Sequence, residues 1–266
     1  MGASAMRALA FLCMMAAFTQ SSAVLAAELR FIGCPVYRDT DSGKKSGCWL
    51  ADDPMTGARY DISLSPTKPD WNFAILVEAA PAGVREDGTD IAPCGGIVLN
   101  PVRVSVLDQP CTRAMLPAEG YPGRAFLLPP RNVRPLYAPH DPVPQPYQAR
   151  RFVIPFDFGR DFIIYQLADY YIDKAVNYAL DIKAREVEIT GYAATAPALV
   201  SGQSIVESED LARMRAERAR NWMLMRGVPE DRIILKWRGT GETLPDEAMD
   251  GIASASLRRV EILIKP

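Results

Sequence analysis

The chain has 266 residues, of which 48% are hydrophobic and 23% are charged. This composition excludes a disordered polymer and is typical of one large globular domain or two small ones. The formal net charge is −2, so the protein has no global basic field to attract nucleic acid, and any site for an anion must be local.

An apolar segment at the N-terminus predicts export. Arg7 precedes an apolar run over residues 8–18, and small residues follow up to Ala26. This order is typical of a secretory signal peptide, whereas a membrane-spanning helix needs about 20 apolar residues. Cys13 has no small residue just before it, which argues against a lipid anchor. We therefore predict a signal peptide over residues 1–26 and a mature protein in the periplasm, with association with the outer membrane left open.

Four cysteines remain once the signal peptide is removed, an even number in an exported chain. Oxidising compartments favour disulfides, and the spacings contain no C-x-x-C pair of the kind that holds zinc. The sequence therefore predicts two disulfides and no metal site. It leaves the connectivity open among Cys34, Cys48, Cys94 and Cys111.

Short β-rich runs, separated by Gly, Pro, Asp and Asn, fill residues 27–125. In the last run, Val102, Val104 and Val106 alternate with other residues, as in a strand. The expected strands cover residues 59–65, 72–80 and 96–107. Together with the paired cysteines they predict a small disulfide-stapled all-β domain, a barrel or a sandwich.

Residues 126–150 are rich in proline, which suits neither a helix nor a central strand. We predict a stiff, extended linker. The only histidine, His140, lies in it, so a Ser-His-Asp or Cys-His catalytic arrangement is not expected. Motifs such as H-E-x-x-H, G-x-S-x-G and G-x-G-x-x-G are also missing from the sequence. We therefore expect neither an enzyme nor a cofactor.

Residues 151–266 contain longer elements, with helical spacing in two segments and alternation in the strands. Ser208 is expected to cap the second helix and Gly227 to end it. The order β-α-β-α-β-β predicts an α+β sandwich with helices on one face of a sheet. The expected strands cover residues 152–158, 186–192, 233–237 and 258–264, and the expected helices cover residues 164–183 and 208–227.

The second of these helices carries several arginines. At 100° per residue, Arg213 and Arg220 fall opposite the apolar side, Arg218 falls at its margin, and Arg215 falls within it. A partly buried guanidinium cannot lose its proton, so it needs an anionic or carbonyl partner. The spacing alone favours an Asp or Glu of the same chain, and a ligand carboxylate is the alternative.

Five motifs occur in order over residues 151–266. They are F-D-F in the first strand, Gly191-Tyr192 at the end of the second, L-A-x-x-R-A from Leu211, G-x-G-E-x-x-P from Gly239 and R-R-V-E-I from Arg258. In this order they resemble the OmpA-like C-terminal domain of outer-membrane proteins, peptidoglycan-associated lipoproteins and motor stators. The likeness covers less than half of the chain.

The resemblance implies non-covalent binding of peptidoglycan through the diaminopimelate of its stem peptide. In the family, an Asp after the glycine-aromatic pair and the Arg of the L-S-x-x-R-A motif hold the two charged ends of that amino acid. The arginine position is Arg215 here. Further candidates for the groove are Tyr192, Arg258 and Arg259, whose alternatives are a core role for the tyrosine and a cross-strand ion pair for an arginine.

The acidic position departs from the family pattern, because Ala194 stands where the family has Asp. Half of the clamp is therefore missing. Loss of one charge-assisted contact weakens binding about tenfold to a hundredfold. Glu207, Glu209 and Asp210 are acids that could fold back to replace it, although acids at a helix start ordinarily serve the helix dipole.

Two functions follow from these residues. The first is a non-enzymatic cell-envelope protein that binds peptidoglycan and tethers the N-terminal β-domain, which another envelope protein could contact; nucleic acid is not an expected partner. The alternative is an OmpA-like fold with a degenerate ligand site, acting as a structural or protein-interaction module of an envelope assembly.

Overall fold

The computed structural model describes residues 28–39, 47–79, 94–118, 120–121, 142–162, 167–244 and 247–266. The predicted signal peptide, most of the proline-rich segment and His140 lie outside these ranges. Among the helices in these ranges, none combines the length and the apolar character needed to cross a membrane.

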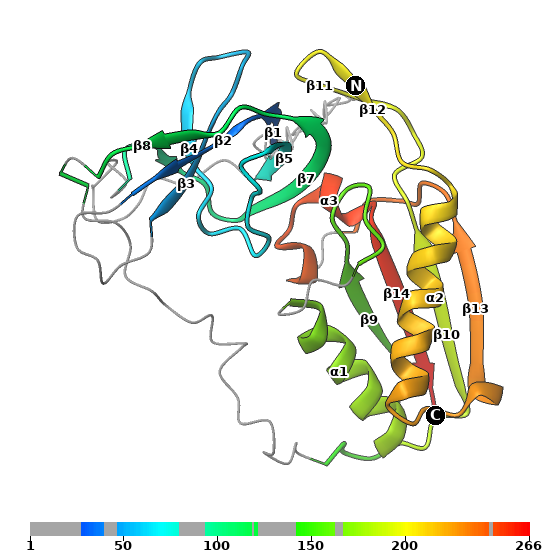
Figure 1. The fold of residues 1–266 in the computed structure, drawn as a ribbon. Helices are drawn as coiled ribbons and strands as arrows, with labels where there is room; N and C mark the ends of the chain where they lie inside the picture. The colour runs from blue at the N-terminus through cyan, green and yellow to red at the C-terminus, as the bar shows by residue number, and fades with distance from the viewer. Residues whose placement is uncertain are drawn as a thin grey trace, which may run out of the picture.

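A four-stranded sheet forms one layer of the C-terminal part, in the order β13-β10-β14-β9. The central strand β10 runs parallel to β13 and antiparallel to β14, and β14 runs antiparallel to β9. Two helices, α1 and α2, cover one face of the sheet (Figure 1). The bounds are β9 Arg150–Pro155, α1 Leu167–Asp181, β10 Glu186–Tyr192, α2 Asp210–Met225, β13 Ile233–Arg238 and β14 Arg259–Lys265.

Alternation along β10 explains why the helices pack on this face. Val187 and Ile189 are fully buried and share one apolar cluster with Ala216 and Ala219 of α2. Gly191 continues the same face, and a Cβ there would lie 2.0 Å from the backbone oxygen of Ala212. The glycine therefore allows α2 to lie directly against β10. The predicted β-α-β-α-β-β order and the α+β class are confirmed.

Some boundaries differ from the expected ones. The first strand ends at Pro155 rather than at residue 158. The second helix begins at Asp210, whose backbone N–H is 3.3 Å from the Ser208 hydroxyl. Five short elements of this part were not expected: the hairpin strands β11 (Ala198–Val200) and β12 (Gln203–Ile205), the 3₁₀ turns η2 (Glu230–Arg232) and η3 (Glu247–Met249) and the helix α3 (Ala253–Ser256).

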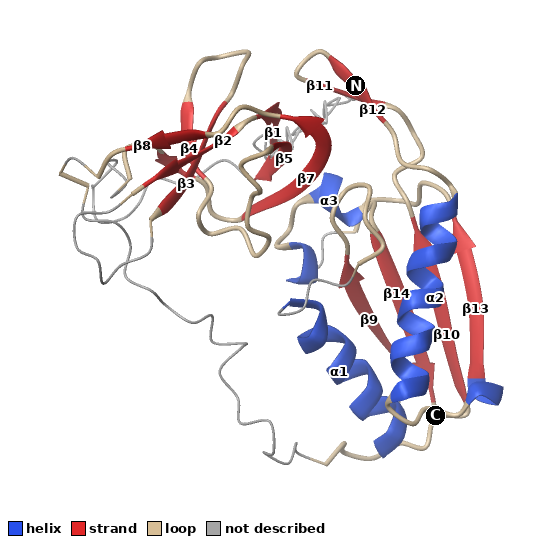
Figure 2. Cartoon of the chain, in the orientation of Figure 1, coloured by secondary structure: helices blue, strands red, loops and turns tan. Residues whose placement is uncertain are grey.

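The N-terminal part consists of two sheets in its described residues (Figure 2). One has the order β1-β5-β7 and the other the order β6-β4-β3-β2-β8. Phe31, Ile75 and Val104 of the first sheet pack with Ala51 of the second in one buried cluster. The bounds are β1 Leu29–Gly33, β2 Pro35–Arg38, β3 Cys48–Asp52, β4 Arg59–Asp61, β5 Phe73–Ala79, β6 Ile97–Val98, β7 Val102–Pro110 and β8 Ala114–Leu116.

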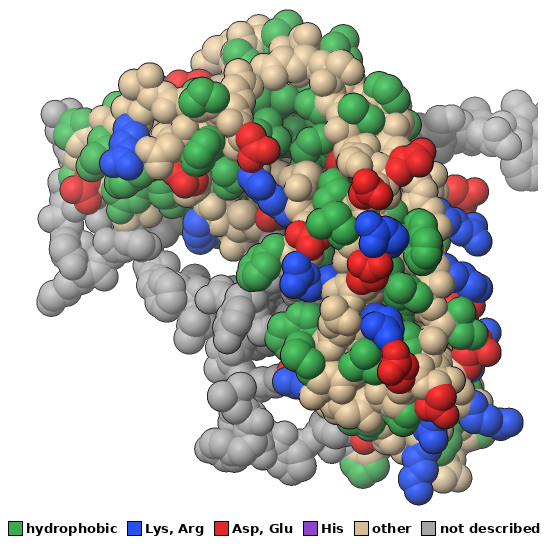
Figure 3. Space-filling model, turned by 45° about the vertical axis from the view of Figure 1, so that its right-hand side comes forward, with side chains coloured by type: hydrophobic (Ala, Val, Ile, Leu, Met, Phe, Trp, Pro, Cys, Tyr) green, Lys and Arg blue, Asp and Glu red, His purple; other side chains and the backbone are tan. Residues whose placement is uncertain are grey.

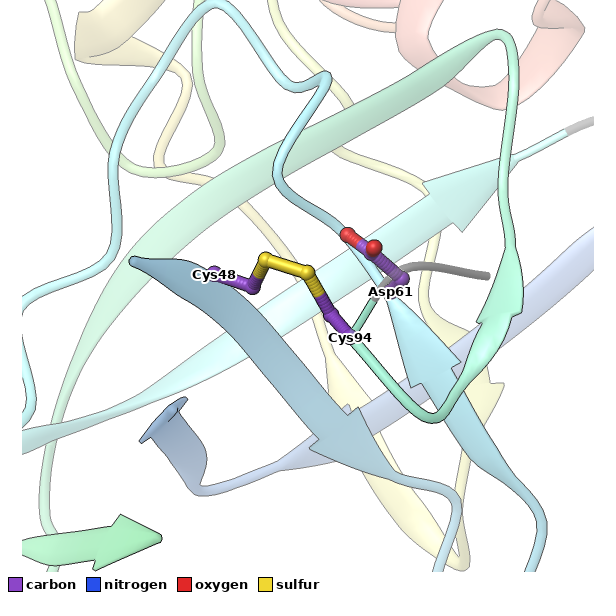
Figure 4. A group of neighbouring side chains, drawn as sticks. All are labelled: Cys48, Asp61 and Cys94. Atoms are coloured by element: carbon purple, nitrogen blue, oxygen red, sulfur yellow. A yellow bond between two sulfur atoms is a disulfide. The ribbon is translucent and has the colours of Figure 1, made fainter. Parts of the chain in front are cut away.

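Two disulfides join this part, as predicted. They link Cys34 to Cys111 and Cys48 to Cys94. The carboxylate of Asp61 lies beside the second pair (Figure 4). Two thiolates and a carboxylate are a common set of metal ligands, but the disulfide uses both sulfurs here.

The two parts of the chain are in direct contact, which an extended linker alone did not predict. Glu78 of β5 forms a buried ion pair with Arg258, and Arg103 of β7 donates a hydrogen bond to Ala248 and forms a 3.1 Å ion pair with Asp250. In Figure 1, β7 lies next to α3 at one end of the C-terminal sheet. This contact buries charged groups of both parts.

Candidate functional site

Arg215 is a fully buried arginine on α2, with 0% of its surface exposed. The other buried residues of this helix are small or apolar: Ala212, Ala216, Ala219 and Met223. Helical spacing places Arg215 on the same side as these residues, as the sequence predicted. The interior position therefore demands that every polar hydrogen of the guanidinium finds an acceptor.

The guanidinium of Arg215 has an acceptor for each of its five donors. Nη1 and Nη2 bind the two carboxylate oxygens of Glu207, at 2.9 and 2.6 Å. The remaining donors bind backbone oxygens: Nε that of Arg160 at 2.9 Å, Nη1 that of Tyr192 at 2.9 Å and Nη2 that of Asp157 at 3.1 Å. In this conformation, Arg215 has no donor left for a ligand.

Glu207 reaches Arg215 from the segment between β12 and α2. Its carboxylate also accepts the backbone N–H groups of Gly159, at 2.7 Å, and Ala194, at 2.8 Å. Burial by itself raises the pKa of Glu207, but the hydrogen bonds and charge of Arg215 outweigh it and hold the pKa below its usual value. The carboxylate is therefore ionised near neutral pH and held by four donors.

The glutamate thus takes the place that the resemblance gives to a ligand carboxylate. The sequence had named Glu207 as one acid that could fold back, but for the opposite role of replacing the Asp missing at Ala194. Ala194 itself is buried and contributes its backbone N–H to the Glu207 carboxylate. Glu209 and Asp210 are exposed at the start of α2.

Tyr192 and Arg259 form a stacked pair. The Arg259 guanidinium lies 4.2 Å from the centroid of the Tyr192 ring, in cation–π geometry. Arg259 also donates to the backbone oxygens of Glu242 and Ser256 and pairs with Glu261 at 2.7 Å. These contacts fix both side chains within the C-terminal part.

Arg258 points toward the N-terminal part instead. It pairs with Glu78, and Glu78 also binds Arg30 at 3.1 Å. Burial by itself lowers the pKa of Arg258, but the charge and hydrogen bond of Glu78 raise it above the usual value. The same cluster keeps the pKa of Glu78 low, although burial alone would raise it. Arg258 is therefore held by the N-terminal part, whereas Tyr192 links Arg215 and Arg259 within the C-terminal part.

A cavity of about 30 Å³ remains beside Ala194. Leu257 and Arg258 line it from the C-terminal part, and Arg30 of β1 lines it from the N-terminal part. A water molecule needs about 10 to 15 Å³ of such space, so the cavity holds about two waters and an amino acid does not fit. Ala194 is the position where the resemblance gives an Asp.

The other arginines of α2 pair with acids on the surface. Arg213 binds Glu217 at 2.9 Å, Arg218 binds Asp161 at 2.8 Å, and Arg220 pairs with Glu230. Figure 3 shows positive and negative side chains intermingled on the visible face rather than a basic patch. Such a mixed surface does not favour binding of nucleic acid.

Sequence reasoning missed two contacts of this site. Glu207 was named as an acid that could fold back, but its pairing with Arg215 was not predicted. Nothing in the sequence indicated that Glu78 pairs with Arg258, because the two residues are 180 positions apart.

Comparison with family models and with curated proteins gave no match. Solved structures did match the C-terminal part. The chain resembles OmpA-like domains. The OmpA-like domain of FopA1 from Francisella tularensis subsp. tularensis SCHU S4 is 23% identical, with a TM-score of 0.35 over 44% of this chain and 73% of that one.

Two further matches are of the same kind. For the peptidoglycan-associated lipoprotein from Burkholderia pseudomallei the identity is 19% and the TM-score 0.33, over 43% of this chain and 90% of that one. The cell wall anchor of the T6SS from Pseudomonas aeruginosa is 17% identical, with a TM-score of 0.34 over 44% of this chain and 82% of that one. Similarity this distant says nothing about a ligand, so the function has to be inferred from the residues of this chain.

Proposed function

We propose that this chain is a non-enzymatic cell-envelope protein in which the OmpA-like part serves as a structural and interaction module. The observation that carries this proposal is the pairing of Arg215 with Glu207. Every guanidinium donor is used within the chain, and the neighbouring cavity is too small for an amino acid. A ligand carboxylate would have to displace a buried acid that keeps four hydrogen bonds.

The two disulfides support a location in the envelope, because disulfides persist in oxidising compartments such as the periplasm. The direct contact between the β-domain and the OmpA-like part supports a structural role for the OmpA-like part. Arg258, a groove candidate by resemblance, binds Glu78 of the β-domain instead. A partner would then contact a surface formed by the β-domain and the OmpA-like part together.

Peptidoglycan binding through Arg215 is the second candidate function. One observation favours it: the donors around Glu207 form a complete carboxylate site, with two from Arg215 and the N–H groups of Gly159 and Ala194. If Glu207 moved out, a stem-peptide carboxylate would find the same four donors.

Co-sedimentation with diaminopimelate-containing sacculi separates the two candidates. The mature protein is compared with Arg215→Ala and with Arg213→Ala, a control on the exposed side of the same helix. Circular dichroism checks that each variant is folded. We expect Arg215→Ala to sediment no differently from the wild type. Binding by the wild type and Arg213→Ala that Arg215→Ala loses would overturn the proposal and favour the second candidate.

A further inference from the structure

A hollow of about 350 Å³ lies on the N-terminal part, open to solvent. Its lining comes from β3, which contributes Trp49, and from the segment before β5, which contributes Pro69, Asp70, Trp71 and Asn72. Sites for small molecules typically have volumes of about 300 to 1,000 Å³ and combine aromatic walls with a few polar groups. The hollow meets both conditions.

Two aromatic rings, Trp49 and Trp71, line the hollow, and the Tyr37 ring packs against both of them. The Trp49 and Trp71 centroids are 5.9 Å apart, and the Tyr37 centroid is 5.2 Å from the first and 6.0 Å from the second, all at steep interplanar angles. Edge-to-face contacts of this kind are favourable and directional. The Tyr37 hydroxyl also accepts the N–H of Gly47 at 3.2 Å. Both tryptophans are only half-buried.

A chain of polar groups runs from the lining residues Asp70 and Asn72 to the neighbouring Arg113. Asp70 Oδ1 accepts the side-chain amide of Asn72 at 2.6 Å, and Asn72 Oδ1 accepts Arg113 Nε at 2.7 Å. The Arg113 guanidinium lies 5.2 Å from the centroid of the Trp71 ring. Within the described ranges, Asp70 Oδ2 and the Nη groups of Arg113 make no hydrogen bond, and both residues are exposed.

These groups match the chemistry of a sugar ring. A pyranose offers an apolar face of C–H groups, which packs on an aromatic ring, and a rim of hydroxyls, each both donor and acceptor. A free carboxylate oxygen accepts from such hydroxyls, and guanidinium N–H groups donate to them. The charges of Asp70 and Arg113 cancel, which favours a neutral ligand over a phosphate or a polyamine.

We propose that the Trp49–Trp71 hollow binds a neutral saccharide, which stacks on the tryptophans and hydrogen-bonds to Asp70 and Arg113. No residue of the hollow contacts Arg215 among the contacts described, so this site is separate from the one under α2. The saccharide could come from the glycan strands of the cell wall or from another polysaccharide. Both share pyranose chemistry, and the ligands tested tell them apart.

The experiment is a calorimetric titration of the mature chain with N-acetylglucosamine trisaccharide in one arm and maltotriose in the other. We expect saturable binding of at least one of them. Trp71→Ala is expected to weaken it at least about tenfold, and Arg113→Ala, an exposed residue whose loss spares the core, by about threefold to tenfold. Trp237→Ala is the control, because this tryptophan is 51% exposed on β13, far from the hollow in sequence.

Preference for the N-acetylated trisaccharide would indicate wall glycan as the source, and preference for maltotriose another polysaccharide. Absence of saturable binding in both arms would overturn the proposal. So would binding that neither Trp71→Ala nor Arg113→Ala weakens. Sedimentation with sacculi that Arg215→Ala keeps and Trp71→Ala loses would come from the hollow, so the two proposals fail separately.

Discussion

At the scale of single residues, Glu207 defines the chemistry beneath α2. It neutralises the only fully buried arginine of that helix and is itself held by two backbone N–H groups. A buried ion pair adds little to stability compared with two apolar residues in the same places. Removal of only one partner, however, leaves an uncompensated buried charge. Single and paired substitutions therefore give different results.

We expect Glu207→Ala to lower the free energy of unfolding by about 3 to 5 kcal/mol, because Arg215 is left buried without a counter-charge. Urea denaturation measures the change. Glu209→Ala, an exposed acid two residues away, is the matched control and is expected to change stability by less than about 0.5 kcal/mol. Acetate added to Glu207→Ala should restore part of the loss, since four donors remain. Equal stability of the two variants would contradict this account.

Asp157 gives the protein a distinctive pH dependence. Its carboxyl is buried, accepts the Thr67 hydroxyl at 2.8 Å, and burial raises its pKa from 3.8 to about 6. A raised folded-state pKa means that the protonated form is favoured by folding. This contribution to stability is complete below about pH 4 and is lost as the pH rises through about 6, a change of about 3 kcal/mol.

Asp157→Asn removes this charge while keeping an acceptor for Thr67. We expect the variant to be more stable than the wild type at about pH 7.5 and to lose that advantage near pH 4, because only the wild type carries the buried charge at the higher pH. Urea unfolding at both values measures the difference. Asp108→Asn, at a 92% exposed side chain, serves as the control. A pH-independent difference would show that Asp157 is not the group responsible.

At the scale of elements, the spacing of apolar residues predicted the long helices and strands, but the turn residues of a short hairpin were overlooked. The apolar spacing of α2 placed Arg215 inward, and alternation placed β10 and β14 in the sheet. The hairpin β11–β12 was missed because each strand has only three residues. Ser201 and Gly202 form its turn, with φ of 48° and 75°. Two positive φ values in a two-residue loop are typical of a type I′ turn.

The sequence predicted an Asp or Glu of the same chain as the partner of Arg215, which is confirmed, but it did not identify Glu207 as that partner. Spacing on a helix says which side chains face inward, but a loop acid reaches them only if the loop folds back, and the Ser201 hydroxyl anchors this one by accepting the N–H of Ile32 at 3.0 Å. Cysteine pairing likewise depends on how strands far apart in sequence meet. Local pattern carries no information on either contact.

The contact between α2 and β10 depends on Gly191. We expect Gly191→Ala to lower the free energy of unfolding by about 2 to 4 kcal/mol, because the added Cβ collides with backbone rather than with a flexible side chain. Gly251→Ala is the comparison, since its φ is +72° but its added Cβ meets no atom within 4 Å. It should cost about 1 to 2 kcal/mol from backbone strain alone. Thermal unfolding that ranks the two in reverse would refute this explanation.

At the scale of the whole molecule, the buried ion cluster of Glu78, Arg258 and Arg30 ties the two parts together. We expect Glu78→Ala to lower stability by about 3 to 5 kcal/mol. Urea unfolding of the wild type should show one transition by fluorescence, since tryptophans lie in both parts, at Trp49, Trp71, Trp222 and Trp237. Glu230→Ala removes an exposed pair and should cost less than about 1 kcal/mol. Two separate transitions in the wild type would contradict the coupling.

The position of Glu207 has one more consequence. Glu207 is only eight residues from Arg215 in the sequence. Its carboxylate therefore always competes with any external carboxylate for binding to the arginine. Short tethers give effective concentrations of about millimolar or more. A dissolved amino acid at micromolar levels loses that competition, whereas a polymer that presents many acids side by side does not face the same disadvantage. One substitution at this glutamate would remove the competitor and leave its four donors open to an added carboxylate.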